Sequence, residues 1–167
     1  MQFMRVALVS SAVVLGACSG SEKKADTTPA TTPAATPGSA PVAAPVAVGT
    51  AAPITGKTIE VKMVGDEKGY RFEPSTITAK TGDGIKFIMV AGGPHNVAFD
   101  PASVPADVRA QLDANFGTDK MAELSSGLKM NAGDTFVLSL GGIKAGKYAF
   151  NCTPHLAMNM KGEITVQ

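Results

Sequence analysis

Hydrophobic and polar positions alternate through much of the chain from residue 54 onward. Residues 58–64, 70–73 and 76–80 each follow a period of two, which is typical of strands with one buried face. Residues 85–90 form a more continuous apolar run, which indicates a strand that is buried on both faces or lies centrally in its sheet. Turn residues such as Gly69 and Gly82 separate these segments.

The rest of this region contains more strand patterns and one exception. We expect strands at 95–99, 134–140, 147–150 and 161–166, and a strand or loop at 121–124. Residues 103–115 instead predict one short helix, because Pro105 suits a first helical turn and Val108 and Leu112 are spaced by four. Many short strands with regular turns and one minor helix predict an all-β sandwich or barrel.

The first 53 residues have a different texture. Residues 1–17 predict a secretory signal peptide, with a positive charge at Arg5 and an apolar stretch too short to span a bilayer. The sequence Leu15-Gly16-Ala17-Cys18 resembles a bacterial lipobox, which implies that Cys18 is acylated; a plain signal peptide is the alternative. Ser19 follows it, and the absence of an aspartate there is compatible with outer-membrane sorting. Residues 18–53, rich in Ala, Thr and Pro, predict a lipidated cysteine followed by a disordered tether.

Charge and composition narrow the class of partner. From residue 54 to residue 167 the chain carries 12 Lys and Arg against 12 Asp and Glu, so this part is neutral. Without a basic patch and with few aromatic residues, the sequence favours no nucleic-acid partner. Its length suits one domain with one hydrophobic core, and we expect a monomer.

The candidate chemistry lies in one loop and one distant histidine. The loop at 152–160 carries Cys152, His155 and Met160, and the only other histidine is His95. A free cysteine or a lone histidine is usually an ordinary core or surface residue. A thiolate, two imidazoles and one thioether together form the ligand set of a blue-copper site, whereas zinc takes a thioether poorly. Met158 is a competing axial candidate, and we favour Met160.

Residues around these positions resemble those of cupredoxins, the blue copper proteins of the plastocyanin/azurin family, and plastocyanin most of all. The matching segments are Pro94-His95-Asn96-Val97-Ala98-Phe99-Asp100, Tyr148 to His155, and Met160 to Val166. The loop at 153–160 is more similar to that of pseudoazurin. Asn151 stands where photosynthetic plastocyanins carry an exposed tyrosine, and the chain has no clear acidic patch, so the resemblance implies electron transfer without implying photosynthesis.

The resemblance implies a Greek-key sandwich of about eight strands, with one copper ion cycling between Cu(I) and Cu(II). The expected ligands are His95, Cys152, His155 and axial Met160, supported by hydrogen bonds from Asn96 and Thr153, and His155 is expected to show an edge to solvent. The expected docking surface for partners consists of Gly93, Pro94, Pro154, Leu156, Ala157 and Met158.

We therefore expect a one-electron carrier that is not an enzyme. Expected partners are redox proteins such as c-type cytochromes or membrane oxidoreductases, and a bacterial membrane reached through lipid on Cys18, with the domain in the periplasm or at the cell surface. A copper storage or delivery protein is the alternative. A copper enzyme is less favoured, because it needs a second copper site and the chain has only two histidines.

Overall fold

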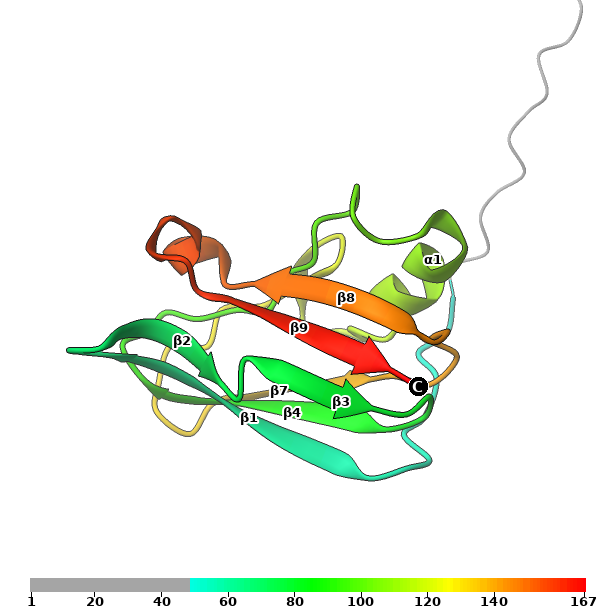
Figure 1. The fold of residues 1–167 in the computed structure, drawn as a ribbon, viewed down its shortest axis with the longest axis horizontal. Helices are drawn as coiled ribbons and strands as arrows, with labels where there is room; N and C mark the ends of the chain where they lie inside the picture. The colour runs from blue at the N-terminus through cyan, green and yellow to red at the C-terminus, as the bar shows by residue number, and fades with distance from the viewer. Residues whose placement is uncertain (1–48) are drawn as a thin grey trace, which may run out of the picture. The chain divides into compact units, whose positions relative to one another are not determined.

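The computed structural model describes residues 49–167, and the predicted signal peptide, Cys18 and most of the predicted tether lie outside them. Nine strands and two short helices make up this part of the chain (Figure 1). The strands are β1 (Thr58–Asp66), β2 (Gly69–Glu73), β3 (Thr76–Ala79), β4 (Gly84–Ala91), β5 (Lys120–Ala122), β6 (Ser125–Ser126), β7 (Thr135–Ser139), β8 (Gly146–Asn151) and β9 (Lys161–Val166). The helices are α1 (Ala106–Ala114) and the 3₁₀ segment η1 (Thr153–Met158).

Two sheets carry the fold. One has the order β2-β1-β4-β7 and the other the order β3-β9-β8, while β5 and β6 form a small separate hairpin. The pairs β1–β4 and β3–β9 are parallel, and the remaining pairs within the two main sheets are antiparallel. The predicted all-β sandwich with a short helix is confirmed, and β4 lies centrally as its apolar run indicated.

The core lies between the two sheets because the buried face of each strand pattern turns toward the other sheet. Phe72 of β2 and Phe87 of β4 meet Phe150 of β8, with ring centroids 4.7 and 5.5 Å apart. All three rings are essentially buried, as are Ile164 of β9 and Leu138 of β7. Aromatic contact across the sheets adds to the area-dependent burial that holds a sandwich together.

The prediction of a strand at 95–99 is wrong. His95 and Ala98 make only isolated bridges, to Lys129, Ser125 and Asn151. The segment changes partner along its length, because His95 exchanges backbone hydrogen bonds with Lys129 while Ala98 exchanges them with Asn151. A regular ladder needs one continuous partner, so the alternating pattern here reports burial without a strand.

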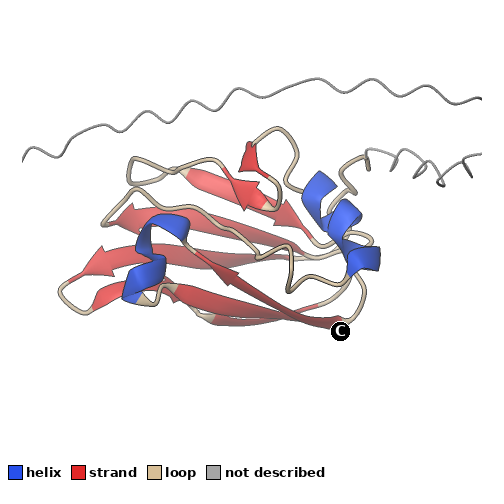
Figure 2. Cartoon of the chain, turned by 90° about the horizontal axis from the view of Figure 1, so that it is seen from above, coloured by secondary structure: helices blue, strands red, loops and turns tan. Residues whose placement is uncertain are grey.

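The two helices lie at opposite ends of the sandwich (Figures 1 and 2). Pro105 precedes α1, and Val108 and Leu112 are its buried residues, as the spacing predicted. The segment after Cys152, predicted only as a loop, forms η1, with Asn159 in the left-handed conformation at its end (φ 61°). None of the helices between residues 49 and 167 has the length and apolar character needed to cross a bilayer.

Candidate metal centre

Two chain segments bring the predicted metal ligands together at the η1 end of the sandwich. The segment after β4 supplies His95, Cys152 lies between β8 and η1, and His155 lies within η1. The nearest donor atoms of these three side chains all lie within 4.8 Å of one another. Within the described residues, this is the one group of three or more histidine, cysteine or acidic side chains arranged to hold a metal ion.

Backbone hydrogen bonds close the loop that carries two of the ligands. The Cys152 amide donates to the Met160 carbonyl at 3.0 Å, and the Met160 amide donates to the His155 carbonyl at 3.2 Å. The side chain of Met160 is completely buried, whereas that of Met158 is 55% exposed. Burial therefore favours Met160 over Met158 as an axial ligand, which stays a prediction.

The ring nitrogens of His95 have definite roles. His95 Nε2 lies 2.9 Å from the Ala91 carbonyl oxygen, which can only accept, so Nε2 carries the proton. His95 Nδ1 therefore presents a lone pair, and it lies 3.6 Å from Cys152 Sγ. His155 Nδ1 lies 3.4 Å from the same sulfur. The lone pair of His95 Nδ1 and the sulfur can therefore both face a cation, and His155 Nδ1 lies where it could join them as a third ligand.

Burial shapes the protonation of this group. It raises the pKa of the Cys152 thiol, although N–H groups nearby act in the opposite direction. Burial, together with the neighbouring His95, lowers the pKa of His155, which favours its neutral, metal-binding form. A metal ion must therefore displace the thiol proton on binding, as soft thiolate sites require.

Hydrogen bonds from Asn96 join the two ligand segments. Its Oδ1 accepts from the Thr153 amide at 2.7 Å, and its Nδ2 donates to the Thr153 hydroxyl at 3.2 Å. Nδ2 also lies 3.1 Å from the hydroxyl oxygen of Ser125 in β6. Because Asn96 follows His95 and Thr153 follows Cys152, these bonds fix the separation of the two ligands.

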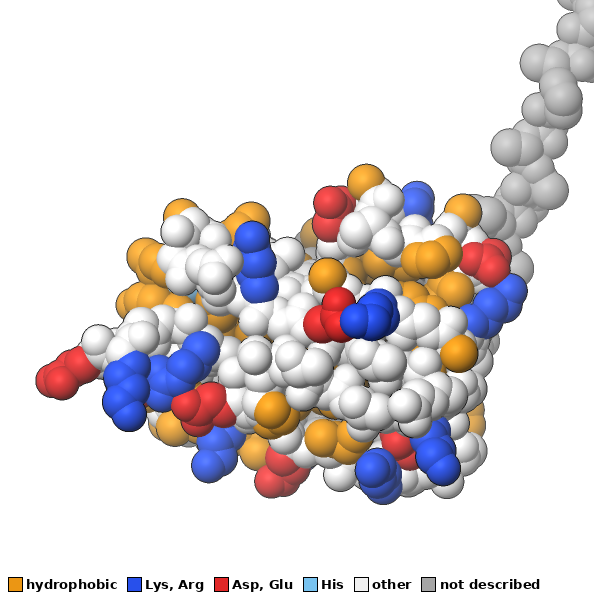
Figure 3. Space-filling view, viewed as in Figure 1, with side chains coloured by type: hydrophobic (Ala, Val, Ile, Leu, Met, Phe, Trp, Pro, Cys, Tyr) orange, Lys and Arg blue, Asp and Glu red, His pale blue; other side chains and the backbone are white. Residues whose placement is uncertain are grey.

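Hydrophobic side chains surround this end of the molecule. Pro154, Leu156, Ala157, Met158 and Gly93 of the predicted docking surface are exposed, and Pro94 is partly exposed. Figure 3 shows hydrophobic side chains gathered at the end where η1 lies. Two exposed methionines join this surface without having been predicted to: Met121 lies 3.8 Å from the Asn96 amide, and Met130 follows the bridge partner of His95.

Sequence reasoning also missed Tyr70 of β2. Its ring stacks on that of His155, with centroids 3.8 Å apart and planes 15° from parallel. His155 keeps 6% of its surface exposed and His95 none, so a small edge of His155 reaches solvent. The available signal was the alternation of 70–73, which puts Tyr70 on the same face of the strand as the buried Phe72.

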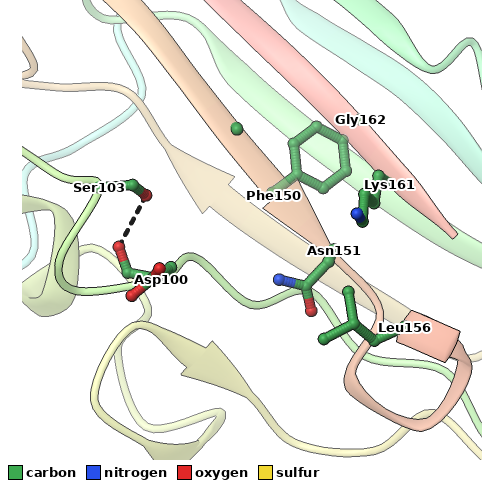
Figure 4. Close-up of a pocket in the computed structure, with 8 residues that line it drawn as sticks. Asp100, Ser103, Phe150, Asn151, Leu156, Lys161 and Gly162 are labelled. Carbon is green, nitrogen blue, oxygen red and sulfur yellow. Dashed lines mark hydrogen bonds between the residues drawn. The ribbon is translucent and has the colours of Figure 1, made fainter. Parts of the chain in front are cut away.

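Asn151 lines a pocket beside the metal centre. The pocket has a volume of about 440 Å³, and Leu156, Lys161, Phe150, Asp100 and Ser103 also line it (Figure 4). On one side of it, Ser103 donates a hydrogen bond to the Asp100 carbonyl within the same loop. None of the four predicted ligands is among the lining residues, so the pocket is distinct from the ligand cluster.

Comparison with known proteins points to copper as the metal. The family model described as copper binding proteins, plastocyanin/azurin family, matches residues 59–167. Plastocyanin A/B of Petroselinum crispum is 39% identical over 108 residues, which are 64% of this chain and 98% of that protein. Plastocyanin of Prochlorothrix hollandica is 35% identical over 118 residues, which are 71% of this chain and 79% of that protein.

A solved structure agrees with the fold. The oxidized form of plastocyanin from Dryopteris crassirhizoma superposes with a TM-score of 0.51 and 36% identity. The superposition covers 65% of this chain and all of the fern chain. His95, Cys152 and His155 thus offer two imidazoles and one cysteine sulfur, a soft ligand set that suits a single copper ion.

Proposed function

Because this chain belongs to the plastocyanin/azurin family of copper-binding proteins, we propose that it is a blue copper protein that carries single electrons between other redox proteins. Bound copper would supply the one-electron couple. The observation that carries the proposal is the convergence of His95 Nδ1, His155 Nδ1 and Cys152 Sγ in a buried site. We assign Met160 as the weak axial ligand because its side chain is fully buried and because it ends the loop that carries Cys152 and His155.

The protein supplies rigidity and access. Residues from two separate segments, tied by Asn96 and Thr153, hold the ligands in one arrangement, so little rearrangement accompanies a change of charge. The slightly exposed His155 lies within an apolar rim formed by Pro154, Leu156 and Met158. Such a rim suits brief contact with an uncharged patch on a partner, for example around the cofactor edge of a c-type cytochrome.

Storage or delivery of copper is the second candidate function. Proteins that hand copper on favour exposed and exchangeable ligands, whereas His95, Cys152 and Met160 have no exposed surface here. The geometry therefore favours retention of the metal and exchange of the electron. We also propose a carrier and not an enzyme, because a copper enzyme needs a second copper site and both histidines of the chain serve this one.

We further propose that the domain acts at a bacterial membrane, in the periplasm or at the cell surface. The support is the lipobox-like Leu15-Gly16-Ala17-Cys18, followed by the Ala-, Thr- and Pro-rich stretch up to residue 53. Several acyl chains on one cysteine give stable anchoring, and a long linker would let the domain reach more than one partner.

The test uses the chain as it is purified after export, loaded with copper. We expect intense blue colour, a reversible one-electron reduction potential, and slow loss of copper to a chelator. A colourless chain that gives up its copper rapidly would instead identify a storage or delivery protein. Because the domain is neutral, the rate of electron exchange with a small haem protein should vary little with salt.

Location is tested separately. Membrane fractionation and mass spectrometry of the N-terminal peptide should find the chain acylated and membrane-bound, and Cys18→Ala should release it. An unmodified Cys18 in the soluble fraction would refute the anchor without affecting the copper assignment.

A further inference from the structure

The two histidines of the metal centre are oriented by different means. His95 is completely buried, and its Nε2 donates to the Ala91 carbonyl at 2.9 Å, which fixes its ring plane. For His155, the side-chain hydrogen-bonding contacts found within residues 49–167 are limited to the one between Nδ1 and the Cys152 sulfur. A metal-binding histidine is normally held by a partner on its other nitrogen. His155 therefore needs another source of orientation.

The ring of Tyr70 supplies a contact of the right kind. It covers one face of the His155 imidazole at a centroid distance of 3.8 Å, with 15° between the planes. It also meets His95 edge-on, with centroids 6.2 Å apart. Since β2 and η1 are far apart in sequence, the stack ties the ligand loop to the other sheet.

The backbone around Tyr70 leaves room for this ring. Gly65 lies opposite Tyr70 in the β1–β2 ladder. A Cβ at position 65 would come within 2.6 Å of Tyr70 Cε1 and 2.9 Å of Gly92 Cα. Gly92 itself has φ +75°, and a Cβ there would lie 2.4 Å from Gly65 Cα. Gly65 thus leaves space for the Tyr70 ring, and Gly92 lets the backbones of β1 and of the segment after β4 approach closely beside it.

The hairpin that carries Tyr70 is fixed on its outer side. The Arg71 guanidinium binds both carboxylate oxygens of Asp66 at 2.7 and 2.9 Å and also binds Glu73. The pair with Asp66 joins β2 to the end of β1, and the contact with Glu73 lies within β2. Together with the ladder pairing of Tyr70 opposite Gly65, the bidentate Asp66–Arg71 pair helps to restrain the backbone that carries the Tyr70 ring.

We propose that Tyr70 is a positioning residue for the copper site, which holds the His155 ring in its ligand orientation as Ala91 holds His95. The proposal rests on the proposed function, because it assigns His155 a metal to bind. It adds that the stack, and not a hydrogen bond, keeps the His155 Nδ1 lone pair directed at the shared site when the copper is reduced.

The test compares Tyr70→Phe, which keeps the ring, with Tyr70→Leu, which keeps bulk and removes the ring. The measurements are the release rate of Cu(I) to a chelator and the NMR line widths of the His155 ring protons, in both Cu(I) and metal-free chains, at about pH 8, where histidine is neutral. Tyr70→Leu should release Cu(I) about three- to tenfold faster and broaden the His155 signals, as the loss of one aromatic stack implies. Tyr70→Phe should stay within about twofold of the unaltered chain.

Tyr148→Leu is the matched control, because Tyr148 is the only other tyrosine and its hydroxyl bonds the Lys144 carbonyl at the other end of β8. It should lower stability without broadening His155. Unchanged release and line widths in Tyr70→Leu, or equal changes in Tyr148→Leu, would overturn the proposal. Failure of the unaltered chain to bind copper would refute the proposed function instead, and the metal-free line widths would still decide whether Tyr70 orients the ring.

Discussion

The two ends of the sandwich both bury polar side chains, and they use them in opposite ways. Asn115 lies just after α1 and is 4% exposed. Its Oδ1 accepts hydrogen bonds from the Ala52 amide and Gln111 Nε2, and its Nδ2 donates to the carbonyls of Ser139 and Gly141, all at 2.9 Å. Every position that the amide can use is filled. At this end the buried polar group is therefore structural, with all its hydrogen bonds made inside the protein.

The η1 end is equally buried but left open in its bonding. Cys152 Sγ faces the Nδ1 atoms of both histidines, and the lone pair of His95 Nδ1 has no partner but the sulfur among the described residues. Strand β4 connects the two ends: Gly84 pairs with Ser139 at one, and Ala91 holds His95 at the other. The contrast teaches that burial alone does not mark a functional site. What marks it is a buried cluster of convergent side-chain atoms that can bind a metal ion.

The largest expected effect comes from removing the thiolate. Cys152→Ser should abolish the blue colour and weaken copper binding by more than about 100-fold, because a hydroxyl stays protonated and is a hard, poor ligand. Visible spectra and copper titration of the purified chain measure this. The metal-free variant should still fold, since serine is smaller than cysteine and can bond the nearby imidazoles. A Cys152→Ser protein that stayed blue would refute the site.

Removing the Asn115 amide at the other end should lower stability and leave the copper site unchanged. Asn115→Ala leaves the Ser139 and Gly141 carbonyls and the Ala52 amide without their partner, which should cost about 2–4 kcal/mol of unfolding free energy. Urea unfolding of the metal-free chain measures it, while the copper spectrum should not move. Gln111→Ala is the matched control with a smaller loss, because Asn115 then keeps three of its four bonds. A shifted spectrum in Asn115→Ala would show that the ends are coupled.

The same contrast explains how far the sequence could predict this molecule. Strands with a continuous partner, such as β1 and β9, were evident from alternation, and the ligand loop was evident because Cys152, His155 and Met160 lie within nine residues. The region 95–99 was assigned wrongly because its pairing changes between Lys129 and Asn151, which no local pattern records. Tyr70 and Asn115 were missed for a related reason: their partners are distant in sequence, and each residue type is ordinary on its own.

The smallest expected effect concerns Asp83, a buried polar residue in the turn before β4 whose carboxylate is also hydrogen-bonded inside the protein. Its side chain accepts from the Lys80 amide at 2.9 Å and the Lys57 amide at 3.0 Å. The Lys80 hydrogen bond chiefly lowers the pKa of this carboxyl, against the opposing effect of burial. A carboxyl with a lower pKa in the folded chain adds stability above its unfolded pKa, near 4, and that stability is lost as pH falls through the folded value.

Asp83→Asn should therefore flatten the acid side of the stability curve. The urea midpoint of the unaltered metal-free chain should fall as pH drops from about 5 to about 3, and the midpoint of Asp83→Asn should fall less. Asp66, Asp107 and Asp134 also have lowered pKa values, but they are present in both chains, so the difference between the curves isolates Asp83. Parallel curves would mean that the two backbone bonds do not favour the charged form. Because the hydrogen bonds of Asp83 go to the backbone of Lys57 and Lys80 and not to any metal ligand, the change should leave the copper spectrum at neutral pH as it is.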